Sequence, residues 1–187
     1  YSLIDQVNRV LAAFPNVTVL AQEEARKSVL KGQLLALRAI GHFGLLQAYC
    51  GNYNPSALGV PLMLASNPTG KPARNTMGEV MNQIDADLTE AKILLSGQAF
   101  SDTVMNKFNI AAYQARIALY KGTYDPAFYN DAALAATEVI SSGVQTLASR
   151  AEFPTVWTDV STKETLFRIR YATSTAIGGL WTTTGNN

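Results

Sequence analysis

Apolar residues recur at steps of three and four along much of the chain, which is the spacing of one face of an α-helix. The pattern predicts helices over residues 2–14, 22–50, 76–95, 107–121 and 127–142. The second is a rod of roughly 40 Å at the usual rise per residue. More than one of its faces is apolar, so it should pack against neighbours on both sides.

Two glycines interrupt this rod, at Gly41 and Gly44. Glycine lowers the stability of an isolated helix, so its use here suggests that a neighbouring backbone approaches closely. We therefore expect both positions to lie at helix contacts.

A stretch rich in glycine and proline, residues 51–75, separates the second helix from the third. Such residues stop helices, and a loop of this length in a compact domain is usually functional or packed on its scaffold. The apolar run Val60–Leu64 favours packing. Thr76 can then cap the next helix, with Glu79 three residues later completing a capping box.

The helices are expected to form antiparallel pairs. Residues 109–143 hold small residues, a turn with Gly122 and Tyr124, and a length near the ~34-residue tetratricopeptide period. The second and third helices form another pair, and such hairpins stack because one alone cannot bury both faces. Residues 165–171 alternate and are rich in β-formers, which predicts a strand. The predicted fold is all-α: tetratricopeptide-like stacked helical hairpins with a long ordered insertion loop and a short strand near the C-terminus.

Composition narrows the possible partners. The 187 residues include 15 Lys and Arg and 14 Asp and Glu, mixed along the chain, which disfavours nucleic acid as a partner. The most apolar stretch, residues 34–49, contains Arg38 and His42 and is too short and too polar to span a bilayer. A folded domain with a sizeable core is therefore expected.

No catalytic constellation is apparent. His42 is the single histidine, on an apolar helix, which favours a core histidine with a satisfied ring over an acid–base catalyst. His42 and Cys50 lack the spacing of a zinc site. Asp85 and Asp87 are two residues apart on a helix and face different ways, unlike the carboxylate pair of a glycoside hydrolase. We expect no catalytic residue, no metal site and no cofactor.

A few side chains remain as candidates for structure or binding. Arg38 on its apolar helix is expected to pair with Asp87 on the third helix, with ligand contact as the alternative. Sugar binding uses aromatic faces and planar hydrogen-bonding groups carried by loops. The candidates of this kind are Trp181 near the C-terminus and Tyr53 with Asn54 in the insertion.

A series of short motifs follows in order along the chain: Lys31–Ala39 with Leu37-Arg38-Ala39, His42-Phe43, Tyr49-Cys50-Gly51, Gly59-Val60-Pro61-Leu62, Arg74–Val80, Asp87-Leu88, Thr137–Gly143 and Glu164–Ile169. This series resembles the SusD/RagB family over about residues 1–171. Gln33 replaces the acidic residue usual after the glycine, and Cys50 stands where a bulkier residue is common; neither removes a helix.

The resemblance implies a helical-repeat domain over residues 1–171, part of a larger protein, and an incomplete loop-rich ligand-binding region beginning at 172–187. It also implies a non-catalytic, surface-exposed outer-membrane lipoprotein, with its anchor upstream of this chain, that captures glycan, or in some members peptide, for a SusC-like TonB-dependent transporter. Two alternatives stay open because a helical scaffold does not fix function. One is a helical-repeat module that grips a peptide or protein segment, and the other is a helical glycosidase.

Overall fold

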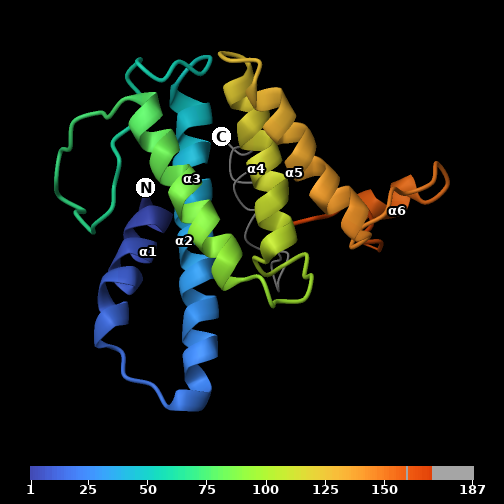
Figure 1. Cartoon of the computed structure of the whole chain (residues 1–187), viewed down its shortest axis with the longest axis horizontal. Helices are drawn as coiled ribbons and strands as arrows, with labels where there is room; N and C mark the ends of the chain where they lie inside the picture. Colours follow the sequence, from blue (N-terminus) through green and yellow to red (C-terminus); the bar gives the residue numbers. More distant parts are fainter. Residues whose placement is uncertain (159, 170–187) are drawn as a thin grey trace, which may run out of the picture.

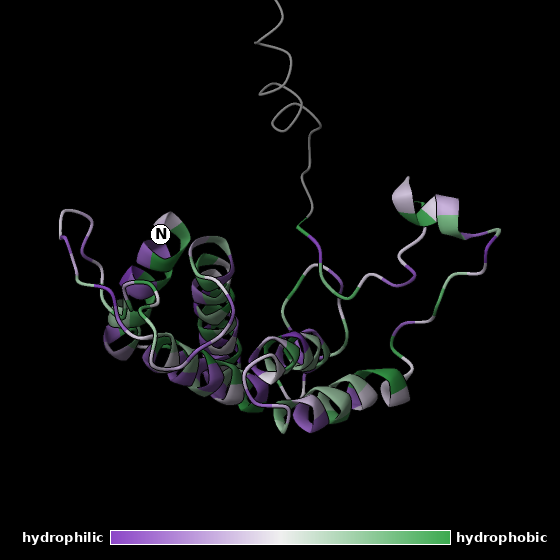
Figure 2. Cartoon of the chain, turned by 90° about the horizontal axis from the view of Figure 1, so that it is seen from above, coloured by the Kyte–Doolittle hydropathy of each residue, from purple (hydrophilic) through white to green (hydrophobic). Residues whose placement is uncertain are grey.

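The computed structural model describes residues 1–158 and 160–169, and the chain forms a layer of packed helices (Figure 1). The five predicted helices are confirmed, and a short sixth was not predicted. They are α1 (Ser2–Ala13), α2 (Glu24–Tyr49), α3 (Met77–Leu94), α4 (Lys107–Gly122), α5 (Phe128–Ser142) and α6 (Phe153–Trp157). Seen from above, the layer is curved, and the connections that follow α5 lie on one side of it (Figure 2).

The helices pair as antiparallel hairpins, which confirms the all-α, tetratricopeptide-like architecture. The most extensive contacts join α2 to α3 and α4 to α5, while α1 lies along α2. The two hairpins meet where α3 contacts α4. The α2–α3 connection is the long insertion, and the α4–α5 connection is the short turn after Gly122, whose Cα lies close under the Tyr129 ring.

One hydrophobic core runs through the contacts of α2, α3 and α4. Its members recur at the three- and four-residue steps seen in the sequence, so the periodic stripes are the buried faces. Burying one large aliphatic side chain contributes about 1.5–3 kcal/mol, so this stripe supplies most of the driving force. The fully or nearly fully buried residues include Leu35, Ala39, Phe43, Leu46, Val80, Ile84, Leu88, Ile110 and Ile117.

The α2 helix has its glycine contact at a different place from the one expected. A Cβ at Gly32 would lie 2.9 Å from Leu95 Cγ and 3.3 Å from the Ala91 carbonyl oxygen, so Gly32 admits α3. Gly41 faces the Ile4 side chain of α1 rather than a backbone, and nothing lies within 4 Å of a Cβ at Gly44. The expectation for Gly44 is wrong because that residue lies on the exposed side of the helix.

Helix α3 begins with the predicted capping box. Thr76 Oγ1 accepts a hydrogen bond from the Glu79 N–H at 3.2 Å, and Glu79 Oε2 accepts one from the Thr76 N–H at 2.8 Å. Helix α4 uses an equivalent pair that the sequence analysis missed, Asn106 and Asn109. The C-terminal end of the insertion and the C-terminal end of the α3–α4 connection are therefore each fixed by a side-chain cap of the helix that follows.

The predicted strand at 165–171 is not formed over its described residues, 165–169. Among the residues that the structure describes, no strand lies beside this segment, and its polar groups form separate hydrogen bonds with other parts of the chain. The Arg168 N–H donates to the Asp102 carbonyl at 2.7 Å, and the Thr165 carbonyl accepts from Gln145 Nε2 at 2.9 Å. Arg170 and Tyr171 lie outside the described residues.

By length and composition alone, the helical stretch Ala21–Tyr49 could cross a bilayer. In this fold it is the central helix of the layer, in contact with α1, α3 and α4. It also carries Arg38, whose guanidinium is largely buried against α3. The stretch is therefore a core helix of the bundle.

Candidate ligand-binding site

The structure brings Arg38 of α2 and Asp87 of α3 together in a two-point ion pair. Arg38 Nε donates to Asp87 Oδ2 and Nη2 donates to Oδ1, both at 2.7 Å. The two side chains are only 11% and 4% exposed, and Gln83 Nε2 donates a further bond to Oδ1 at 2.8 Å. A buried carboxylate needs such full satisfaction, so the pair fixes the register of α2 on α3.

The same network continues to α1 and to the insertion. Arg38 Nη1 donates to Asn8 Oδ1 at 3.3 Å, and Asn8 Nδ2 donates to the Met63 carbonyl at 2.9 Å. The Met63 N–H donates to His42 Nε2 at 3.2 Å. His42 Nδ1 lies 3.0 Å from the Arg38 carbonyl, so the ring is a neutral tautomer that donates through Nδ1. Burial lowers the pKa of His42 below its ordinary value of 6.5.

The base of the insertion, residues 51–75, is tied to itself and to the start of α3. The Gly59 N–H donates to the Asn75 carbonyl at 2.7 Å, and the Leu62 N–H donates to Asn75 Oδ1 at 3.0 Å. Arg74 donates to the carbonyls of Gly59 and Leu58 at 2.6 and 2.8 Å. The predicted packing of the loop is confirmed at Val60, which is buried, while Leu64 is 46% exposed.

A cavity of about 570 Å³ lies between the first helix and this insertion. Its volume falls in the range of small-molecule sites. One wall of the cavity is formed by α1 and by Tyr1, which precedes it, and the other wall is formed by the loop. The residues that line it include Tyr1, Asp5, Gln6, Arg9, Pro61, Met63, Asn67 and Pro72.

Two side chains that line the cavity, Asp5 and Arg9, form a connected set of hydrogen bonds with Ser66 of the loop. Ser66 Oγ donates to Asp5 Oδ1 at 2.6 Å, Arg9 Nη2 lies 2.8 Å from Asp5 Oδ2, and Arg9 Nε donates to Ser66 Oγ at 3.1 Å. The Ser66 hydroxyl bond is the main cause that lowers the pKa of Asp5, so the carboxylate stays ionised at neutral pH. A carboxylate, a guanidinium and nearby amides can together bind the hydroxyl groups of a sugar.

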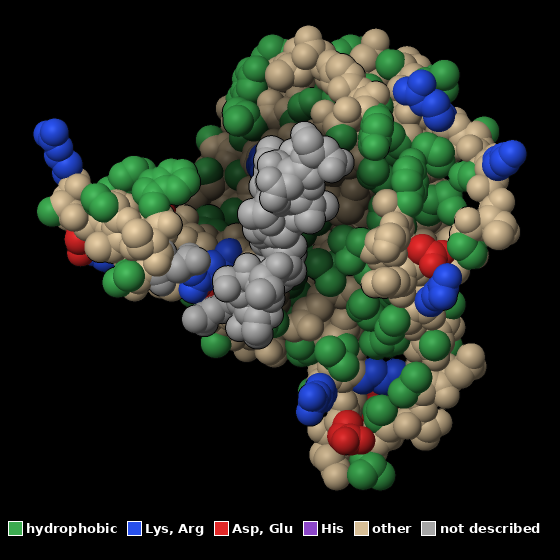
Figure 3. All heavy atoms as spheres, turned by 180° about the vertical axis from the view of Figure 1, so that it is seen from behind, with side chains coloured by type: hydrophobic (Ala, Val, Ile, Leu, Met, Phe, Trp, Pro, Cys, Tyr) green, Lys and Arg blue, Asp and Glu red, His purple; other side chains and the backbone are tan. Residues whose placement is uncertain are grey.

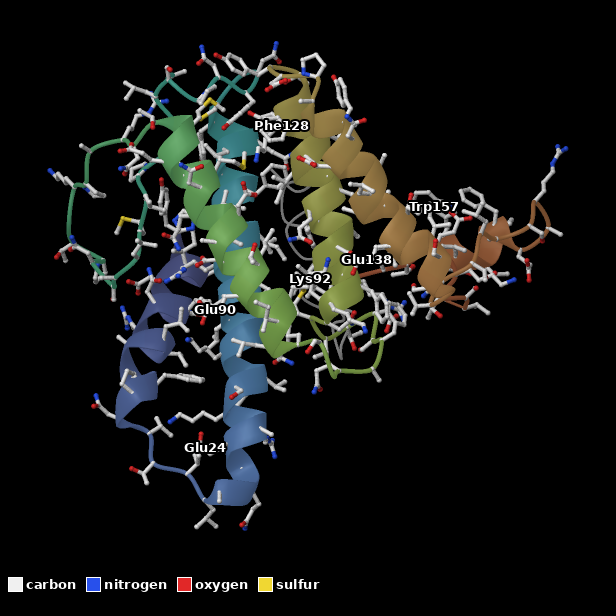
Figure 4. The ribbon with its side chains drawn as sticks, viewed as in Figure 1. Glu24, Glu90, Lys92, Phe128, Glu138 and Trp157 are labelled. Carbon is white, nitrogen blue, oxygen red and sulfur yellow. The ribbon has the colours of Figure 1, made fainter. Side chains whose placement is uncertain are left out.

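A second cavity, of about 380 Å³, lies between α3, α4 and α5 and is smaller than the one beside α1. Lys92 Nζ lies 2.6 Å from Glu138 Oε2 and bridges the two hairpins (Figure 4). Lys121 Nζ pairs with Asp85 at 2.9 Å and lies 4.1 Å from the centre of the Phe128 ring. This groove is a joint between hairpins, and the cavity beside α1 is the better candidate for a ligand.

The face seen in Figure 3 carries scattered charges of both signs among apolar side chains. It offers no continuous basic track for a phosphate backbone. Within residues 1–158 and 160–169, no three His, Cys, Asp or Glu side chains gather as a metal site would require.

Tyr53 does not lie where a sugar-stacking ring was expected. Its side chain is 7% exposed, with ring centres 5.9 Å from Tyr120 and 6.1 Å from Tyr124. The expectation of a free aromatic face at Tyr53 is therefore wrong, because the loop folds this ring into the core, where burial raises the pKa of its hydroxyl. Asn54 is exposed, and its Oδ1 accepts the Ser56 N–H at 3.0 Å in a local turn. Trp181 lies outside the described residues.

Sequence reasoning missed the groups that form the cavity and hold its loop wall. Asn8 had a signal, since it is a polar residue beside Ile4 and Val7 on the buried face of α1. Asp5 and Arg9 are one helical turn apart and could have been noted as an ion pair. Their partners Met63 and Ser66 are more than fifty residues away, so local pattern could not supply them.

The chain is thus a helical-repeat scaffold of stacked hairpins with a cavity at an inserted loop. Residues 1–119 match the SusD-like family described as "Starch-binding associating with outer membrane". This match covers more than half of the chain, and the chain therefore belongs to the SusD-like family. No curated protein is similar enough in sequence to count as a relative.

Solved structures agree with the family. A SusD superfamily protein from Bacteroides thetaiotaomicron is 28% identical with a TM-score of 0.77, covering 89% of this chain and 36% of that one. Another, from Bacteroides vulgatus, is 23% identical with a TM-score of 0.75, covering 91% and 39%. A laminarin-binding SusD-like protein is 23% identical with a TM-score of 0.62, covering 86% and 33%. The chain thus spans less than half the length of these relatives.

Proposed function

We propose that this chain is the helical scaffold of a non-catalytic glycan-binding component of an outer-membrane import system, and that oligosaccharide binds in the cavity between α1 and the insertion. The observation that carries the proposal is a cavity lined by polar side chains in a protein of the SusD-like family. The polar lining includes Asp5 and Arg9, which are bonded to each other and to Ser66, and Gln6 and Asn67. The family description supports glycan as the ligand class.

The wider setting follows from the family and from the resemblance stated above. We propose a surface-exposed lipoprotein of the outer membrane whose partner is a SusC-like TonB-dependent transporter. Residues 1–171 would be the helical-repeat domain, and residues 172–187 would begin a further loop-rich region that includes Trp181. Co-purification of a transporter with the full-length protein tests the partnership, and a full-length protein that is recovered alone after gentle extraction argues against it.

Calorimetric titration of the full-length protein with soluble starch and laminarin oligosaccharides and with peptides tests the ligand class. Arg9→Ala should weaken oligosaccharide binding by about tenfold, the worth of one charge-assisted hydrogen bond. Arg116→Ala is the matched control, because Arg116 is an exposed arginine on α4 outside the cavity. Equal affinities of the two variants would place the site elsewhere, and binding of peptides alone would favour the peptide-binding alternative.

A further inference from the structure

The loop wall of the cavity is tied to the helices at two residues, through the Ser66 side chain to α1 and through the backbone of Met63 to α1 and α2. Met63 lines the cavity, and both of its backbone polar groups are bonded to side chains of helices. Its carbonyl accepts from Asn8 Nδ2 of α1 at 2.9 Å, and its N–H donates to His42 Nε2 of α2 at 3.2 Å. Asn8 and His42 are each 1% exposed, so water does not compete for these bonds.

We propose that His42 and Asn8 are positioning residues for the ligand cavity, and that protonation of His42 releases the Met63 wall. The effect on a ligand rests on the function proposed above, whereas the release of the loop does not. The stretch that would move is residues 61–72, which form the loop side of the cavity.

The bonding pattern leaves His42 only one productive protonation state. Its Nδ1–H is directed at the Arg38 carbonyl and its Nε2 lone pair receives the Met63 N–H. A proton on Nε2 would place two N–H donors against each other and remove the bond. Asn8 holds only the other backbone group of Met63, since its Nδ2 donates to the Met63 carbonyl while its Oδ1 accepts from Arg38 Nη1.

The charges around His42 come from two helices. From α2, the Arg38 guanidinium opposes a proton on the ring, while Asp87 of α3 favours it. Asp87 is itself bonded to Arg38 and Gln83, and the loop presents the backbone of Met63. Burial is the largest influence and keeps the ring neutral near neutral pH.

Amide hydrogen exchange of the ligand-free full-length protein tests the release. Between about pH 7.5 and about pH 5, where histidine changes charge, exchange at Met63 should accelerate about five- to tenfold after correction for intrinsic rates. Gly59 is the internal control, because its N–H is bonded to the Asn75 carbonyl and should show no such change. His42→Gln keeps an acceptor but does not titrate, and should abolish the pH effect. Asn8→Ala should accelerate exchange at both pH values.

The second measurement is the oligosaccharide affinity of the same proteins across the same pH range. The wild type should lose about five- to tenfold in affinity on acidification and His42→Gln should not. The inference is overturned if the corrected exchange rate at Met63 in the wild type does not depend on pH. It is also overturned if oligosaccharide affinity depends on pH in the same way in His42→Gln as in the wild type. Exchange that responds as described while no oligosaccharide binds at any pH supports the release and contradicts the proposed function instead.

Discussion

The α1–α3 half of the molecule and the α4–α5 hairpin are held together in different ways. Between α1, α2 and α3, the buried polar side chains Asn8, His42 and Asp87 join the helices to each other and to the loop. Between α4 and α5 the buried side chains are apolar, as at Ala118 and Val139. Helix α5 also leaves Leu134 and Ile140 more than 70% exposed.

The two halves of the molecule show two kinds of contact, one that stabilises helices and one that also fixes where they lie. Apolar contacts stabilise a hairpin but tolerate small shifts, whereas a satisfied polar network requires one arrangement of its members. A loop fixed by such a network can present a ligand cavity, which is why we place recognition in the α1–α3 half. The following predictions test this contrast, from the largest expected effect to the smallest.

The largest effect should come from the buried ion pair. Asp87→Asn leaves the Arg38 guanidinium buried without its counter-charge and should cost about 3–5 kcal/mol of unfolding free energy. Asp85→Asn is the matched control on the same helix, because Asp85 is 42% exposed and pairs with Lys121, and it should cost about 0–1 kcal/mol. Urea unfolding measures both, and similar losses would contradict the account.

Substituting alanine for two glycines of α2 should change the stability of the fold in opposite directions. Gly32→Ala forces a methyl group against Leu95 and the Ala91 carbonyl and should destabilise the fold by about 1–3 kcal/mol. Gly44→Ala meets open space and should stabilise by about 1 kcal/mol through helix propensity. Thermal unfolding of the two variants checks this, and destabilisation by Gly44→Ala would mean that this face is covered.

Stability should also depend on pH through His42. Its pKa is lower in the folded protein than the unfolded value near 6.5, so the unfolded chain binds the proton first and stability falls as pH drops below that value. The loss should approach about 1 kcal/mol, the worth of the Met63 bond, and be absent in His42→Gln. The pKa of Asp5 and of Glu79 is also lowered, but those carboxylates act in a separate, more acidic window, below about pH 4.5. A wild-type curve that is flat between about pH 7 and 5 would contradict this assignment.

The smallest effect is expected at an exposed leucine of α5. Leu134→Ser removes an apolar side chain that is 72% exposed and should change stability by no more than about 0.5 kcal/mol. Leu88→Ala in the core should instead cost about 2–5 kcal/mol. Denaturant midpoints compare the two, and a large loss in Leu134→Ser would show that another surface covers it.

The helices and the hairpin pairing could be predicted because both follow from local periodicity. The stripe of Val80, Ile84 and Leu88 is the buried face of α3, and Thr76 with Glu79 caps it as expected. Arg38 and Asp87 could be paired in advance because each is a charge on an apolar helix face. These features depend on residues that are close in sequence, or on charged residues that are rare on apolar helix faces and therefore easy to pair.

The cavity and its loop wall could not be predicted in this way. Asn8 and His42 bond to the backbone of Met63, and no side-chain pattern marks a backbone partner 55 or 21 residues away. The prediction of an exposed ring at Tyr53 was wrong for the same reason. An aromatic residue among glycines and prolines suggests an exposed loop, and the distant residues Tyr120 and Tyr124 that contact this ring cannot be identified from local sequence. The strand predicted over residues 165–171 is not formed at 165–169 because a strand needs a neighbouring strand to pair with, and β-propensity does not reveal whether one is present.

The most direct test of recognition in the α1–α3 half is amide chemical-shift mapping of the protein with an oligosaccharide that calorimetry shows to bind. The account predicts that the largest shifts fall on residues 2–9 of α1 and on residues 61–72 of the loop, with α5 unaffected. Largest shifts on Phe128–Ser142, or in the groove between the hairpins, would contradict it.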